Sequence, residues 1–554
     1  MLGAAAAIGL VWLALPLFSV SPPSGALPAV DEPELFFEGT GPHTRPITTQ
    51  SATAQQFFNQ GLNFLYAFNH AEARRSFRAA ARHDPSCGMA WWGLAAANGP
   101  HINFPSVPPE QEKEAVEALE QASALLPGLP EVERDLIQAA RVRYRWPQVE
   151  DRSELDRAYA DEMRKLWAKY PADVDIGALF AEAMMNLRPW DLWTQEGKPQ
   201  PGTEEIVSAL DKVLELNPRH PFGLHLYIHA VEASPEPQRA AEAADRLRDL
   251  QPGLAHNQHM PSHIDVRLGN WRKAIVANEK AIIADRAYRS KRAKQGFYRI
   301  YMTHNHHMLA FAAMMSGQSA LAVRHIDEML AEMPEDFRRE FAPLVDGFFM
   351  MAYEVRLRFG RWDEVLAMPE PPDFFPTARA FHHAARAVAY AAKKLPEQAR
   401  QEQEAFLAAR RQVPEDSMFG NNRSHDLLSV AEHLTAGEIL VADGRLDAAV
   451  EELRQAVKVE DSLRYDEPPN WIQPTRHPLG VILLAAGRYQ EALEVYREDL
   501  RHYPNNGWSL YGMADALDRL GRKAEAEQAR ARFQTVWAEA DMKIHSSCLC
   551  VPLV

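Results

Sequence analysis

Small and aromatic residues recur at fixed spacings in this chain, and this periodicity constrains its fold more than any other feature. One skeleton near the N-terminal end has intervals of 12, 4, 3 and 5 residues and consists of Gly61, Ala73, Phe77, Ala80 and Pro85. Near the C-terminal end it recurs as Gly480, Ala492, Tyr496 and Pro504, and then as Trp508, Gly512, Ala524 and Ala531. The step from Gly480 to Gly512, like that from Ala492 to Ala524, is 32 residues. A repeat of this length is typical of one structural unit that stacks on its neighbours to bury a continuous core.

The residue types in the skeleton are those of paired helices. Small residues let two helices approach closely, aromatic rings fill the space between them, and proline ends the second helix. Weaker copies end at Pro252 and Pro334, and no run of alternating β-branched residues predicts a sheet. The skeleton resembles the tetratricopeptide (TPR) repeat. This resemblance implies an all-α, TPR-like solenoid of helical hairpins wound into a right-handed superhelix.

The composition of the 554 residues is that of an ordinary globular protein, with 46% hydrophobic and 24% charged residues. The formal net charge of −15 argues against a nucleic-acid surface. Three cysteines are too few to form a disulfide framework in a chain of this size, so packing must hold the fold together.

The chain divides into six predicted segments. An almost uninterrupted apolar run at its start is typical of a signal peptide or an N-terminal anchor. We therefore expect an exported protein, periplasmic or extracellular, whose sole membrane attachment is that anchor. The segments are the signal peptide or anchor (1–27), a linker (28–50), N-terminal TPR-like hairpins (51–200), central hairpins with a histidine-rich groove (201–345), C-terminal TPR repeats (346–540) and a tail (541–554).

Histidines are concentrated in the central segment. Between His225 and His307 lie eight of the 21 histidines, whereas an even spread would place about three there. Two pairs, His225/His229 and His259/His263, have the i, i+4 spacing that directs two side chains from one face of a helix. This spacing lets a helix offer two imidazoles to one metal ion.

The repeat register places these histidines on the first helices of three successive hairpins, which we expect to line one concave groove. Because Pro261 lies within the second of these helices, we expect that helix to begin at Pro261, with His256 and His259 in the loop before it. The predicted metal ligands are His225, His229, His259, His263, His304 and His307. Predicted supporting residues are Glu232, His256, His306 and Glu182. Glu232 could bind the metal or accept a hydrogen bond from an imidazole.

Several functions are compatible with such a groove. The leading hypothesis is a scaffold that binds a transition metal ion (Zn, Cu or Fe) and, with it, a protein, peptide or small-molecule ligand. A second is a metal-dependent hydrolase or oxidoreductase that uses the same imidazoles. A third is a peptide-binding adaptor without metal, and a fourth is a cluster of acid and base histidines.

Five passages resemble a family of bacterial exported TPR-containing proteins. They are Asp84-Pro-Ser-Cys-Gly-Met-Ala-Trp-Trp-Gly, Leu226-Tyr-Ile-His-Ala-Val-Glu-Ala-Ser, His259-Met-Pro-Ser-His-Ile, His304-Asn-His-His and Trp508-Ser-Leu-Tyr-Gly. Together with His225, the histidine-containing passages give the patterns HxxxHxxE, HMPSH and HNxH. The resemblance implies a helical-repeat fold and assigns no activity. Whether the chain is an enzyme is left open by these residues.

Overall fold

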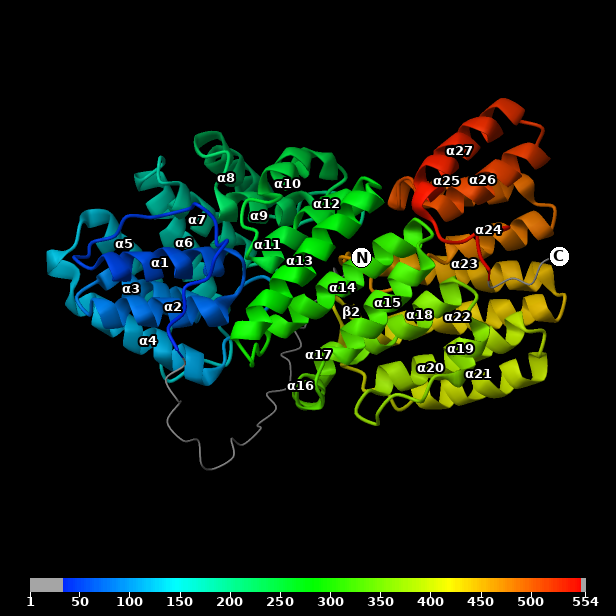
Figure 1. Ribbon diagram of the computed structural model, residues 1–554, viewed down its shortest axis with the longest axis horizontal. Coiled ribbons are helices and arrows are strands. Elements are labelled where there is room, and N and C mark those ends of the chain that lie inside the picture. The colour runs from blue at the N-terminus through cyan, green and yellow to red at the C-terminus, as the bar shows by residue number, and fades with distance from the viewer. Residues whose placement is uncertain (1–32, 550–554) are drawn as a thin grey trace, which may run out of the picture. The chain divides into compact units, whose positions relative to one another are not determined.

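The elements of this protein are almost all helices (Figure 1), as shown by a computed structural model that describes residues 33–549. The predicted signal peptide or anchor, 1–27, lies outside the described residues. Two compact units divide the chain, residues 1–36 and residues 37–554, and everything below concerns the described part of the second unit.

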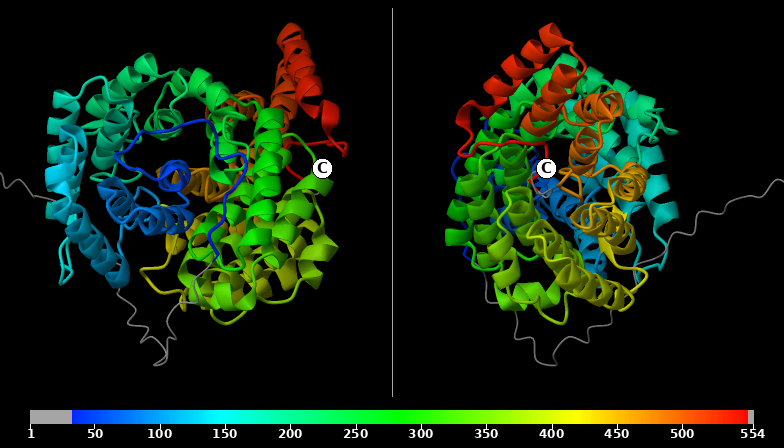
Figure 2. Two further views of the ribbon diagram at one scale, coloured as in Figure 1. Left: turned by 60° about the vertical axis from the view of Figure 1, so that its left-hand side comes forward. Right: turned by 90° about the vertical axis from the view of Figure 1, so that its right-hand side faces the viewer.

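The helices follow one another with short connections, and the views of Figure 2 show them stacked side by side. The first group is α1 (Ala52–Tyr66), α2 (His70–His83), α3 (Gly88–Ala97), α4 (Pro109–Ala124), η1 (Leu126–Gly128), α5 (Glu131–Arg141), α6 (Ser153–Lys169), α7 (Val174–Met185) and α8 (Thr203–Leu216). The central group is α9 (Pro221–Val231), η2 (Pro237–Ala240), α10 (Ala241–Leu247), α11 (Ala255–His259), α12 (Pro261–Arg267), α13 (Trp271–Lys291), α14 (Tyr298–Met315) and α15 (Ser319–Ala331).

The remaining helices complete the array. They are α16 (Glu335–Glu340), α17 (Ala342–Val345), η3 (Asp346–Phe349), α18 (Met351–Arg358), α19 (Trp362–Ala367), α20 (Pro376–Ala392), α21 (Pro396–Arg410), α22 (Ser424–Ala442), α23 (Leu446–Ser462), α24 (Arg476–Ala485), α25 (Tyr489–His502), α26 (Gly507–Arg519), α27 (Lys523–Val536) and η4 (Trp537–Glu539). Strands β1 (Met418–Phe419) and β2 (Asn422–Arg423) form a short antiparallel pair just before α22. Within residues 33–549, no helix is long and apolar enough to cross a membrane.

Contacts between glycines and aromatic rings hold the hairpins together. A Cβ atom added to Gly61 would lie 2.9 Å from the Phe77 ring, and one added to Gly512 would lie 2.2 Å from the Tyr496 ring. Because real Cβ contacts are almost never this short, only glycine allows the ring to pack against the backbone at these positions. The predicted all-α fold of TPR-like hairpins is thereby confirmed.

The last helix differs from its predicted register. Ala524 and Ala531, which the 32-residue step placed between paired helices, are exposed, while Ala526 and Ala529 are buried. The cause is the length of the preceding helix, because α26 continues seven residues beyond Gly512 whereas α24 continues five beyond Gly480. Helix α27 therefore begins 11 residues after its glycine, against nine for α25, which places Ala526 rather than Ala524 between the paired helices.

The helices that carry the histidines lie where two hydrophobic cores meet. One core takes in the N-terminal half of α14, including Tyr298 and Met302. The other takes in its C-terminal half, including Met308 and Phe311. His304 to His307 lie between these two parts of the helix. The polar side chains of α14 are thus placed in the interior of the protein.

Candidate metal centre

Four helices position the histidine cluster. Helix α9 begins at Pro221, where His220 accepts a hydrogen bond from the Gly223 backbone N–H, and it carries His225 and His229. Helix α12 begins at Pro261, as predicted. The residues before it are not a loop, because α11 already forms a helical turn and Met260 has helical backbone angles. A proline at the first position of a helix lacks only an N–H that would be unpaired there.

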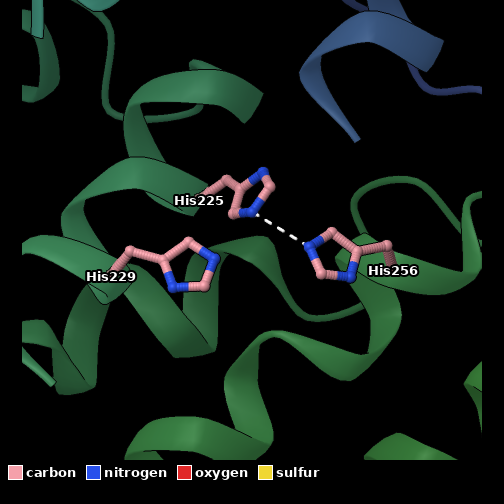
Figure 3. Close-up of side chains that lie close together, drawn as sticks. All are labelled: His225, His229 and His256. Atoms are coloured by element: carbon pink, nitrogen blue, oxygen red, sulfur yellow. Dashed lines mark hydrogen bonds between the residues drawn. The ribbon is translucent and has the colours of Figure 1, made fainter. Parts of the chain in front are cut away.

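Three imidazoles from α9 and α11 form a first set, which we call the first triad: His225, His229 and His256. Their potential ligand atoms all lie within 4.8 Å of one another. Figure 3 shows the three rings facing one another, with Nε2 of His225 and Nε2 of His256 separated by 3.2 Å. His256, predicted to be a supporting residue, is thus a full member of the cluster.

Three further imidazoles form the second triad: His259, His263 and His304, from α11, α12 and α14. Their potential ligand atoms also lie within 4.8 Å of one another. Nε2 of His259 and Nε2 of His263 are only 2.7 Å apart. The ring of His304 lies 4.6 Å from that of His259, measured between centroids.

Protein acceptors hold the outer nitrogens of four of these rings. Nδ1 of His225 lies 2.8 Å from the backbone oxygen of Tyr66. Glu232 accepts from Nδ1 of His229 at 2.7 Å with one carboxylate oxygen and from Nδ1 of His263 at 2.5 Å with the other. Because these acceptors have no proton to give, each Nδ1 carries the hydrogen and each Nε2 presents a lone pair to the interior of the cluster.

The fourth acceptor is the side chain of Asn278. Its amide nitrogen donates to the Ala274 backbone oxygen at 2.9 Å, so its oxygen faces Nδ1 of His259 at 2.7 Å. Metal-binding histidines are held in this way in proteins, with the second nitrogen bonded to a carboxylate or carbonyl group. The arrangement leaves the lone pairs of His259 and His263 facing each other.

Two neutral rings in this arrangement repel each other, and a cation between their Nε2 atoms removes the repulsion: either a second proton on His263, whose pKa Glu232 raises despite burial, or a metal ion. A tetrahedral ion with bonds of 2.0–2.1 Å holds its nitrogens about 3.3 Å apart. The 3.2 Å between His225 and His256 matches this value, and the 2.7 Å between His259 and His263 would have to widen by about 0.6 Å. Nε2 of His229 is buried and has no hydrogen-bond partner within residues 33–549. The residues present therefore fit a metal ion.

Burial keeps most of these rings neutral. Desolvation, together with the neighbouring imidazoles, holds the pKa of His225, His256 and His259 well below the usual range. Burial also lowers the pKa of His263, but the adjacent Glu232 carboxylate outweighs it and raises that pKa above its usual value. Burial opposes the charge of Glu232, and the two histidines beside it nevertheless lower its pKa to about 2. Neutral imidazole is the form that binds metal.

We expected these rings to line a concave groove, but the structure buries them. All the rings of the two triads are buried except that of His304, which is partly buried. The reason is that the helices on both sides belong to the two hydrophobic cores, which close over the cluster.

Three other predicted residues belong to neither triad. The His307 ring lies 6.2 Å from that of His304, on the same side of α14, and packs against Phe348, 5.5 Å away, and Phe419, 6.2 Å away. His306 turns toward α15, where its Nδ1 lies 3.1 Å from Nδ1 of His325. Helical rotation explains this direction, because residues two apart on a helix face different sides. Glu182 pairs with Arg143 and Asn186.

A cavity of about 700 Å³ reaches the cluster at His229 and Glu232. Trp190 lies on its wall, and its ring packs edge-on against His229 with 5.4 Å between centroids. The Tyr465 hydroxyl lies 3.3 Å from Glu232 and within hydrogen-bond distance of Glu467, so its single hydrogen is shared between the two carboxyl groups. A small molecule in this cavity would therefore contact one imidazole of the first triad and the carboxylate that supports both triads.

Fold and site together define a helical-repeat protein with a buried histidine cluster beside a cavity. The tetratricopeptide repeat family matches residues 483–539. The chain therefore contains TPR repeats, as the skeleton around Gly480 and Gly512 predicted. A search of curated proteins found no match.

Several solved structures are similar to this chain at low identity. The Cut9–Hcn1 hetero-tetramer of APC/C matches with 13% identity and a TM-score of 0.33, over 88% of this chain and 74% of the other. The human IFIT1 dimer with m7Gppp-AAAA matches with 14% identity and a TM-score of 0.33, over 89% and 92%. Yeast Tom70 matches with 12% identity and a TM-score of 0.28, over 88% and 91%.

Proposed function

We propose that this TPR-containing scaffold binds a transition metal through its histidine cluster and presents it to a ligand or partner in the adjoining cavity. One observation carries the proposal: protein acceptors hold four imidazoles so that their Nε2 lone pairs converge on a buried space. Nε2 of His229 has no hydrogen-bond partner within residues 33–549, and an unsatisfied buried polar atom costs about 1–3 kcal/mol, so a cation that receives this lone pair stabilises the site.

The donor set indicates the class of metal. Neutral imidazole nitrogens suit Zn, Cu and Fe, whereas Mg and Ca prefer oxygen ligands. Three imidazoles leave at least one coordination position free for an outside ligand. We further propose that the protein is exported, as in the bacterial family it resembles, which rests on the apolar sequence of residues 1–27 alone.

The cavity favours a second candidate, a metal-dependent hydrolase or oxidoreductase. A volume of about 700 Å³ is in the range of small-molecule sites, and its wall includes His229 and Glu232. A bound metal would supply Lewis acidity or redox chemistry there. The Tyr465 hydroxyl, 3.3 Å from Glu232, would be placed to move a proton at the cavity wall.

Protein purified without a histidine tag tests the metal proposal. We expect stoichiometric Zn, Cu or Fe by elemental analysis, and a melting temperature that falls when a chelator removes the metal. A ligand present at 100 times its dissociation constant stabilises the folded state by about 2.7 kcal/mol. The double variant His229→Ala/His263→Ala should lose this metal-dependent increment.

A matched control uses two other histidines that also pair with glutamates. His383 and His433 lie 2.8 Å from Glu402 and Glu452, respectively, away from the cluster. His383→Ala/His433→Ala should keep the full increment. An empty parent protein whose melting temperature does not respond to added Zn²⁺, Cu²⁺ or Fe²⁺ would instead favour a metal-free peptide-binding adaptor.

A further inference from the structure

The six imidazoles of the cluster separate into two sets of three. Within each triad the potential ligand atoms lie within 4.8 Å of one another. Between the triads, the nearest rings are those of His229 and His263 at 5.4 Å and of His256 and His259 at 5.8 Å, measured between centroids. Ring spacing alone does not divide the six, because the rings of His229 and His256 in the first triad are 6.4 Å apart and those of His263 and His304 in the second are 6.0 Å apart. The division rests on the potential ligand atoms, which converge within each triad.

Glu232 joins the triads without competing for their metal-binding atoms. Its two oxygens accept from Nδ1 of His229, in the first triad, and from Nδ1 of His263, in the second. Both of its oxygens are thus engaged with outer nitrogens, and both rings keep Nε2 free for the interior of their own triad. One buried carboxylate consequently aligns one imidazole in each set.

One buried carboxylate supplies negative charge to both triads. The six imidazoles bring no charge when neutral, whereas Glu232, 1% exposed, has a pKa that, against the effect of burial, the two adjacent histidines lower to about 2. Burial raises the pKa of Glu467, on the same cavity wall, to about 8, so that group gains a negative charge at neutral pH only beside a cation. The local charge therefore favours bound cations through Glu232.

We propose that the cluster is a dinuclear centre that holds one transition-metal ion in each triad. This inference rests on the proposed function, since it specifies how many ions the histidine cluster takes. Each ion receives three imidazole nitrogens and keeps a position open to another ligand. Glu232 positions one ring of each half, so the occupation of one half is coupled to the geometry of the other.

Half-site variants test the number of ions. His256 belongs to the first triad and His304 to the second, and neither contacts Glu232 within residues 33–549. Full-length protein, stripped by chelator and titrated with Zn²⁺, should bind two ions per chain. His256→Ala and His304→Ala should each bind one. His307→Ala, one turn from His304 and outside both triads, should still bind two.

Loading with Cu²⁺ gives an independent readout. Two nearby Cu²⁺ ions interact through space, so the parent should give a dipolar-broadened electron paramagnetic resonance spectrum with a half-field signal. Each half-site variant should give the narrower spectrum of one isolated ion, without the half-field signal. Circular dichroism shows whether each variant is still folded. The more conservative variants His256→Gln and His304→Gln then show whether an ion is lost because its ligand is missing.

The failure of this inference differs from the failure of the proposed function. If the parent binds one ion and either half-site variant binds none, the dinuclear centre is wrong and the proposal of a metal-binding scaffold stands. Two ions in both half-site variants also overturn it. A parent that binds no ion removes both proposals.

Discussion

One carboxylate orients two imidazoles in this protein. Glu232 is 1% exposed, and each of its oxygens accepts a hydrogen bond from a different histidine, His229 or His263. A buried carboxylate is costly unless hydrogen bonds compensate it. Here the two imidazole donors and the Tyr465 hydroxyl supply them. The same bonds determine which nitrogen of each ring is available to a metal.

Glu232→Gln should weaken metal binding without removing any imidazole. The amide has one accepting oxygen and one donating nitrogen, so it can accept from His229 or His263 but not from both. Loss of such a supporting acceptor typically lowers metal affinity 10–100-fold. Competition with a chromogenic chelator measures this change. Glu328→Gln, beside His325 rather than the triads, should leave the affinity within about twofold; an equal loss in both variants would contradict the role assigned to Glu232.

The sequence located the cluster but not its full membership. Five of the six predicted ligands lie in the triads, because i, i+4 spacing is visible in the residues alone. His256 was counted among the supporting residues, while His259, expected in the same loop, was predicted as a ligand through its i, i+4 pairing with His263. His307 was included because the repeat register places it on the groove face with His304, and it packs instead against Phe348. The acceptor at Tyr66 is 159 residues from His225, a contact that no local pattern predicts.

At the scale of helices, the Gly and aromatic skeleton was sufficient to predict the fold. Tyr496 packs against both Gly480 and Gly512, so one ring connects two successive hairpins. The two-residue extension of α26 is visible in the sequence, because the turn glycine Gly521 follows Gly512 by nine residues whereas Gly487 follows Gly480 by seven. The prediction of a constant 32-residue step did not use this difference. The difference affects α27, where Ala526 and Ala529 are buried instead of the predicted Ala524 and Ala531.

Gly512→Ala should destabilise the C-terminal repeats. The new Cβ would meet the Tyr496 ring at 2.2 Å, so either the ring or the helix must move. Overpacking of this kind costs about 1–3 kcal/mol. Urea unfolding followed by circular dichroism measures the change. Ala531→Leu, on the exposed side of α27, should stay within about 0.5 kcal/mol of the parent; a neutral Gly512→Ala would show that this hairpin contact is wrong.

At the scale of the whole molecule, the candidate centre links helices of successive hairpins. In a repeat array such hairpins otherwise contact only their adjacent repeats. The ligands of the centre come from α9, α11, α12 and α14, which lie where the two hydrophobic cores meet. In a helical-repeat protein, stability is close to a sum of repeat and interface terms. Bound metal would add a direct link between successive hairpins and would couple the two cores.

Anomalous diffraction from a metal-loaded crystal tests the central claim most directly. Data collected on both sides of the absorption edge of the bound metal locate that metal alone. The account predicts strong anomalous peaks enclosed by His225, His229 and His256 and by His259, His263 and His304, about 2.0–2.1 Å from their Nε2 atoms. A fully loaded crystal with no anomalous peak inside the histidine cluster would contradict it.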